Sequence, residues 1–184
     1  SLFCPHPPFI ARRADFEMFE NSLPPPRLAT PDQDHLAIAA WRHAGNTEDV
    51  SPKAVATSRA AYYGLVHMVD RIVGRINDAV DGRENTVTIY TSDHGESLGE
   101  RGLWWKSTMY DESAKVPLII RSPDFHLGKT DDRVTSLMDL SATILGWADA
   151  ADLPGHTGQD LRSSGNWLDT CHGAYYGGLM NIHV

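Results

Sequence analysis

The sequence has 184 residues, enough to bury one hydrophobic core within a single domain or a large part of one. Its 24 acidic and 16 basic side chains give a formal net charge of −8. The sequence contains no basic stretch that could bind a phosphate backbone, which argues against nucleic acid as a partner. The longest apolar runs, such as residues 116–120, are too short to cross a bilayer, so no membrane association is expected.

The two cysteines, Cys4 and Cys171, lie far apart in the sequence and lack the spacing of a metal site. We expect two buried free thiols rather than a disulfide, which favours a reducing compartment and hence a cytoplasmic location. Both ends carry strand-like residues without a starting methionine or a polar tail. The sequence is therefore expected to be a fragment of a longer chain, and a homo-oligomer is compatible with it.

The expected elements follow one another in the order of an α/β domain. Residues 1–53 carry most of the prolines and predict an extended segment and loop with at most short helices. Apolar residues at helical spacing predict a helix over 57–80, and a second amphipathic helix is expected over 135–148. The β-branched runs "TVTIYT" and "VPLIIRS" predict two short strands between these helices.

This order predicts a mostly parallel central sheet flanked by helices, in which functional sites lie beyond the carboxyl ends of the strands. Residues 54–150 are expected to form the α/β core. Residues 1–53 are the proline-rich segment before it, and residues 151–184 form a loop-rich C-terminal part. Together they are expected to make one partial catalytic domain.

The first strand ends in "SDHG", which places Asp93 and His94 at such a carboxyl end. An adjacent carboxylate and imidazole can both turn onto a divalent cation where the backbone bends, and Gly95 permits a bend. On their own, however, the two residues fit a turn cap and a satisfied polar side chain better.

Other residues could join this cluster. Lys106 lies among aromatic residues in "GLWWKSTM", where a partly desolvated ammonium could neutralise an oxyanion, and His6 lies between prolines in "CPHPPF". Trp104 or Trp105 could line a substrate pocket or pack in the core. Glu100 and Arg101 are expected to pair with each other.

Two of these stretches carry a resemblance to a known family. "TSDHGESLGERGLWWKSTMYDESAKVPLIIRSP" closely resembles a segment of the sulfatase family, within the alkaline phosphatase superfamily, as choline sulfatases and their bacterial relatives carry it. "PHPPF" is similar to the matching stretch of phosphonate monoester hydrolases of the same group. The resemblance covers most of residues 1–145 and implies a fragment of an alkaline phosphatase-like sandwich, in a bacterial cytoplasmic protein.

The resemblance implies a role for each matching residue. Asp93 and His94 would ligate a divalent metal, Mn or Ca, while Lys106 and His6 would bind the sulfate or phosphoryl oxygens and assist the leaving group. Trp104 is the residue we assign to the substrate pocket. The expected substrate is a small-molecule sulfate ester or a phosphate or phosphonate ester.

The family also uses a formylglycine nucleophile, formed from a C/S-x-P-x-R motif, and an early pair of aspartates on the same metal. Cys4 and Cys171 are not followed by that pattern, so neither is the nucleophile. Both missing elements are expected in an N-terminal part that precedes this sequence. We therefore expect the parent protein to be a sulfatase, with phosphonate monoester or phosphodiester hydrolysis, or a non-catalytic α/β remnant, as alternatives, and the fragment alone to be inactive.

Overall fold

A computed structural model describes residues 2–45, 47, 49–125, 128–151, 153–177 and 180–183. The chain divides into two compact units. The first comprises residues 1–83, 94–115 and 177–180, and the second comprises residues 84–93, 116–176 and 181–184. Within the described residues, no helix is long and apolar enough to span a membrane.

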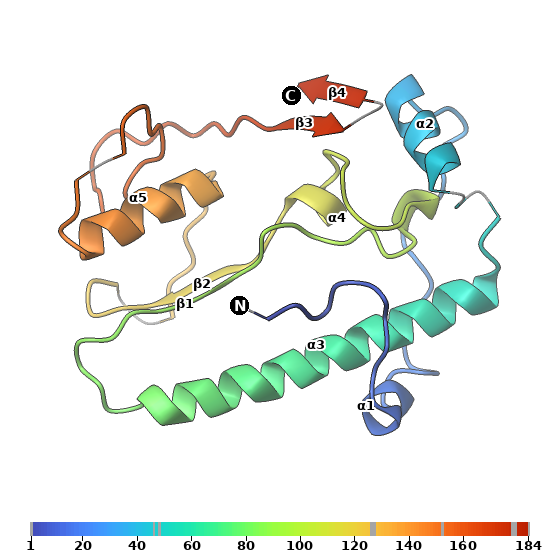
Figure 1. Cartoon of the computed structure of the whole chain (residues 1–184), viewed down its shortest axis with the longest axis horizontal. Helices are drawn as coiled ribbons and strands as arrows, with labels where there is room; N and C mark the ends of the chain where they lie inside the picture. The colour runs from blue at the N-terminus through green and yellow to red at the C-terminus, as the bar shows by residue number, and fades with distance from the viewer. Residues whose placement is uncertain are drawn as a thin grey trace. The chain divides into compact units, whose positions relative to one another are not determined.

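The first unit is built on the long helix α3 (Pro52–Val80), which Figure 1 shows as one continuous rod. The unit also contains α1 (Arg13–Glu17), α2 (Leu36–Ala44), the 3-10 turn η1 (Glu100–Gly102) and α4 (Asp111–Ala114). The proline-rich region thus forms only short helices, as its composition predicts. The helix α3 begins five residues before the predicted start because the Ser51 hydroxyl accepts a hydrogen bond from Ala54 N and Pro52 occupies the first turn.

The helices α1 and α3 approach each other closely at a glycine. A β-carbon on Gly64 would lie 3.1 Å from the Asp15 carbonyl group and from Ala11 Cβ. This approach buries Asp15, whose carboxylate pairs with Arg71 and lies 4.0 Å from the ring of His67. One face of α3, including Ala60, Leu65 and Val69, is buried in the same unit.

The second unit contains the strands β1 (Thr88–Thr91) and β2 (Leu118–Arg121) and the helix α5 (Leu137–Trp147). The strands coincide with the two predicted runs, but they pair antiparallel, with Thr88 opposite Arg121. This pair is antiparallel because the segment 92–117 returns to the sheet at the end it left, without a crossover. The mostly parallel central sheet stays a prediction.

The helix α5 begins at a reciprocal cap. Asp139 Oδ2 accepts a hydrogen bond from Ser136 N at 2.7 Å, and Ser136 Oγ accepts one from Met138 N. The buried Thr143 hydroxyl then donates to the Asp139 carbonyl oxygen and accepts from Leu161 N. The strands β3 (Ala174–Gly177) and β4 (Met180–His183) form a second two-stranded sheet.

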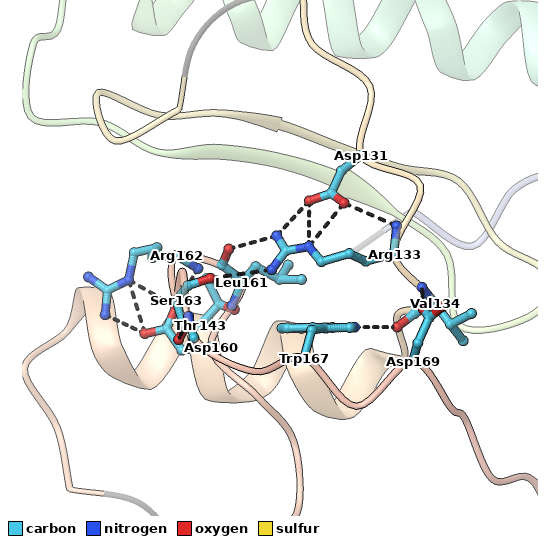
Figure 2. Close-up of polar contacts among 11 residues, drawn as sticks. Asp131, Arg133, Val134, Thr143, Asp160, Leu161, Arg162, Ser163, Trp167 and Asp169 are labelled. Atoms are coloured by element: carbon cyan, nitrogen blue, oxygen red, sulfur yellow. Dashed lines mark hydrogen bonds and ion pairs between the residues drawn. The ribbon is translucent and has the colours of Figure 1, made fainter.

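Arg133 connects two loops of the second unit, at residues 131–134 and 161–167 (Figure 2). Arg133 makes a bidentate ion pair with Asp131, donates to the Leu161 carbonyl oxygen at 3.0 Å and stacks over the Trp167 ring. Because Trp167 Nε1 also donates to the carbonyl oxygen of Val134, the two loops are joined at several points.

Cys4 and Cys171 are both free thiols, but Cys4 is half-buried and Cys171 is exposed, so the expectation of buried thiols is wrong.

The contact between α1 and α3 should be sensitive to acid. Hydrogen bonding to Arg71 holds the pKa of the Asp15 carboxyl below its ordinary value of 3.8, outweighing the effect of burial, with His67 and Arg12 adding smaller attractions. A carboxyl whose pKa is depressed by folding contributes stability above its unfolded-state pKa and loses it as the pH falls towards the folded-state value. The free energy of unfolding should therefore decrease as the pH drops below about 4.

Urea denaturation at a series of pH values checks this expectation. Asp15→Asn should lower the stability at neutral pH and flatten the acid limb. Asp70→Asn, which changes an exposed carboxylate of α3 next to Arg71 in the sequence, should leave both unchanged. An acid limb of equal steepness in wild type and Asp15→Asn would contradict the assignment.

Candidate functional site

The loop that follows β1 passes very close to another main-chain segment at Gly95. Gly95 N donates to the Ser113 carbonyl oxygen at 2.7 Å, and a β-carbon on Gly95 would lie 2.2 Å from the carbonyl oxygen of Glu112. The sequence suggests that Gly95 permits a bend, but the structure gives a different reason for it. Glycine is required because the backbone at 112–113 occupies the space of a side chain.

His94 has a defined protonation pattern. Its Nδ1 lies 2.8 Å from the carbonyl oxygen of Gly95, which can only accept, so Nδ1 carries the proton. In the neutral ring, Nε2 is then the nitrogen that has a lone pair for a metal or a proton. The ring centroid of His94 lies 6.3 Å from that of His6.

The structure brings His6 and Lys106 into direct contact across 100 positions of sequence. Lys106 Nζ lies 2.7 Å from His6 Nε2, while His6 Nδ1 lies 2.7 Å from the Pro7 carbonyl oxygen. Because a carbonyl oxygen fixes the proton on Nδ1, Nε2 accepts from the lysine ammonium. The lysine is half-buried, as its aromatic neighbours predict.

Asp93 belongs to the second compact unit, whereas His94 belongs to the first. The Asp93 carboxylate is exposed and accepts a hydrogen bond from Ser92 Oγ at 3.3 Å. A carboxylate oxygen and an imidazole nitrogen are donors of the kind that a divalent cation accepts, but two donors are too few for a closed site. No cluster of three or more His, Cys, Asp or Glu side chains suited to a metal occurs in the described part of the chain. The metal-ligand roles stay predictions.

Trp104 packs in the core. Its side chain is 8% exposed and lies near Gly99, next to the fully buried Leu103. Trp105 is half-buried, and its ring lies 2.7 Å from where a β-carbon on Gly45 would be. The assignment of Trp104 to the substrate pocket stays a prediction. Its burial fits the alternative given in the sequence analysis, which was packing in the core.

Buried charges hold the loop between Ser97 and Leu103. Arg59 of α3 donates from Nη1 to the Leu98 carbonyl oxygen at 3.0 Å and pairs with Glu100 at 3.4 Å. Glu100 also accepts from Leu28 N at 2.8 Å. The expected pair of Glu100 with Arg101 is therefore wrong.

Arg101 has other partners than Glu100. Its guanidinium lies over the Tyr110 ring at 4.4 Å and 3.8 Å from a Glu112 carboxylate oxygen. The two neighbours diverge because Arg101 adopts a positive φ of 55°, which turns its side chain away from that of Glu100.

Sequence reasoning missed the carboxylate of Glu96. Its Oε1 accepts hydrogen bonds from Trp105 N at 2.5 Å and Leu98 N at 3.3 Å. Burial raises the pKa of Glu96, although these hydrogen bonds and the nearby charges of Lys106 and His94 act in the opposite direction. An acid three residues after Asp93 is visible in the sequence, but its main-chain partners are not.

Comparisons with known proteins identify the family of this chain. The sulfatase family model matches residues 10–150. The chain is 33% identical over 173 residues to the choline-sulfatase of Rhizobium meliloti (strain 1021), covering 90% of this chain and 32% of that protein. It is 31% identical to the structure of phosphonate monoester hydrolase SpPMH from Silicibacter pomeroyi, with a TM-score of 0.77, covering 86% of this chain and 35% of that one.

A further structural relative is BT4656, solved in complex with its substrate D-glucosamine-2-N,6-O-disulfate. The identity is 25% and the TM-score is 0.65, with 79% of this chain and 32% of that chain covered. These matches define the fold as that of the alkaline phosphatase-like superfamily. The chain belongs to the sulfatase family, and it spans about a third of the length of the relatives it matches.

The close approach at Gly95 predicts a large cost for a single methyl group. Gly95→Ala should lower the free energy of unfolding by about 3 kcal/mol or more, because the Glu112 carbonyl oxygen that it meets belongs to the backbone and cannot rotate away. Chemical denaturation monitored by circular dichroism measures the change.

Gly74→Ala is the matched control. Gly74 lies within α3 with nothing inside 4 Å of an added β-carbon, so alanine there should stabilise the protein by about 0.5–1 kcal/mol. Equal stability of the two alanine variants would show that the Gly95 backbone is not confined as described.

Proposed function

We propose that the protein containing this chain hydrolyses sulfuric esters, with His6 and Lys106 acting on the sulfate group. The observation that carries the proposal is the 2.7 Å hydrogen bond between Lys106 Nζ and His6 Nε2, with the His94 ring beside His6. Membership of the sulfatase family supports it. His6, from the N-terminal segment, thus lies beside two nitrogen-bearing side chains of the segment after β1, and all three are half-buried, which suits the binding of an anion.

The chemistry of the proposed reaction follows from these groups. A sulfate ester carries its charge on non-bridging oxygens, and the Lys106 ammonium would hold that charge while the bond to the leaving oxygen breaks. A protonated nitrogen beside the bridging oxygen would donate the proton that an alkoxide needs on departure. Because Lys106 and His6 share a hydrogen bond, one of them can bind an oxygen while the other holds the proton.

The proposed cofactors are a divalent metal, Mn or Ca, and a formylglycine residue. Asp93 and His94 Nε2 would supply a carboxylate and an imidazole to the metal, whose chemical contribution is to polarise a sulfate oxygen. The formylglycine and the remaining metal ligands are proposed to lie in a part of the protein outside this sequence. The central sheet of the whole domain is proposed to be mostly parallel.

Hydrolysis of a phosphonate monoester or phosphodiester is the second candidate. It is favoured by the likeness to phosphonate monoester hydrolase SpPMH, at a TM-score of 0.77. Rates of the whole protein on an aryl sulfate, choline sulfate, a phosphodiester and a phosphonate monoester decide between the two. The absence of turnover on all four would favour the third reading, a non-catalytic α/β module.

The loss of the lysine ammonium should strongly reduce turnover. Lys106→Ala is expected to lower kcat/KM on an aryl sulfate by roughly 10²–10⁴-fold, because transition-state charge and leaving-group protonation both lose a donor. Lys115→Ala, an exposed lysine of the same segment, is the control and should change the rate by less than about twofold. A similar rate in both variants would contradict the role of Lys106.

Metal removal tests the two proposed ligands. Chelation should abolish turnover by the whole protein, and Asp93→Ala should weaken binding of Mn or Ca, measured by calorimetry, by about 10-fold or more. Asp111→Ala, an exposed acid of α4, should bind the metal as the wild type does. Unchanged affinity in Asp93→Ala would remove Asp93 from the ligand set.

A further inference from the structure

The backbone on both sides of Lys106 has an unfavourable conformation. Trp105 has a φ of 65° and Ser107 a φ of 75°, although neither is a glycine. Residues other than glycine rarely adopt positive φ angles, and they keep them only where the surrounding structure holds the backbone in place. The position of the Lys106 side chain therefore depends on what fixes these two neighbours.

Trp105 is fixed through both of its main-chain polar groups. Its N–H donates to Glu96 Oε1 at 2.5 Å, and its carbonyl oxygen accepts from Ser97 N at 2.7 Å. The same Glu96 oxygen accepts from Leu98 N at 3.3 Å, so one carboxylate connects the start of the loop to the residue before Lys106. It bridges nine positions of sequence with a side chain that is half-buried.

We propose that Glu96 is a positioning residue, which holds the strained backbone before Lys106 and thereby sets the lysine ammonium on His6 Nε2. The part of this inference that concerns turnover rests on the proposed hydrolase function. The geometric part, that Glu96 controls the placement of Lys106, stands without it.

Two roles of the carboxylate can be separated by substitution. Glu96→Gln retains an oxygen acceptor at the same reach and removes the negative charge near Lys106. Glu96→Asp retains the charge but shortens the side chain, so that it no longer reaches Trp105 N. If Glu96 acts by position, the aspartate variant is impaired and the glutamine variant is close to wild type.

The placement of Lys106 is measured by competitive acetylation of the whole protein, with peptides quantified by mass spectrometry and the exposed Lys53 as internal reference. An ammonium hydrogen-bonded to His6 and half-buried should react slowly. Glu96→Asp should raise the relative rate at Lys106 by about 5-fold or more, and Glu96→Gln should change it by less than about 2-fold. Slow labelling in both variants overturns the proposal, and so does fast labelling only in Glu96→Gln, which would point to the charge.

Glu100→Gln is the matched control, because Glu100 is another largely buried carboxylate of the same loop that accepts a main-chain N–H. Glutamine at this position keeps an oxygen acceptor for its partners, Leu28 N and Arg59, so it should change labelling of Lys106 by less than about 2-fold. An equal rise in Glu100→Gln and Glu96→Asp would show a general loosening of the loop and would overturn the specific role.

Turnover supplies the second measurement. Glu96→Asp should lower kcat/KM on an aryl sulfate by roughly 10–100-fold in the wild-type background, since small misplacements of a reacting group are costly. In a Lys106→Ala background the same change should cost less than about 2-fold, because the residue that it positions is gone. An equal cost in both backgrounds would contradict action through Lys106. If the wild type hydrolyses no ester, the proposed function fails, and the labelling result alone decides the role of Glu96.

Discussion

The contacts of the buried Arg59 guanidinium are those on which the first part of the loop before Lys106, at Leu98 and Glu100, depends. Arg59 comes from the face of α3 that packs inside the first unit, and its side chain is only 8% exposed. A charge in such a place needs partners, and it finds them in the Leu98 carbonyl oxygen and the Glu100 carboxylate. The helix therefore anchors the loop at Leu98 and Glu100, in addition to the 3-10 turn and the main-chain hydrogen bonds within the loop.

A second arginine extends this dependence towards α2. Arg42 donates from Nη1 to the carbonyl oxygen of Arg101 at 3.0 Å and pairs with Asp34 at 2.9 Å. With Arg59, it satisfies the main-chain carbonyl groups of Leu98 and Arg101, while main-chain hydrogen bonds within residues 97–105 hold the rest of the loop. Such a scaffold can hold Leu98, Arg101, Trp105 and Ser107 at positive φ, each at a cost on the order of 1 kcal/mol.

The sequence predicts the elements well because their signals are local. Apolar spacing locates α3 and α5, and β-branched runs locate β1 and β2. The meeting of His6 with Lys106 was anticipated only through the family resemblance, since no local signal relates positions 100 residues apart. The antiparallel pairing of β1 with β2 and the separate partners of Glu100 and Arg101 were missed, because they depend on chain direction and on one backbone angle. Glu96 was missed because its partners are main-chain N–H groups, which every residue type except proline offers.

The hydrogen bond between Lys106 and His6 also sets an electrostatic limit. With His6 Nδ1 donating to Pro7 and Nε2 accepting from the ammonium, the two side chains together carry one positive charge, the same as a lysine alone. Sulfate monoesters, phosphodiesters and phosphonate monoesters are all monoanions at neutral pH, and a single cation balances each of them equally. The charge of the Lys106–His6 pair therefore does not discriminate between a sulfur and a phosphorus central atom. Discrimination between them has to come from the size and polarity of the substituents around that atom.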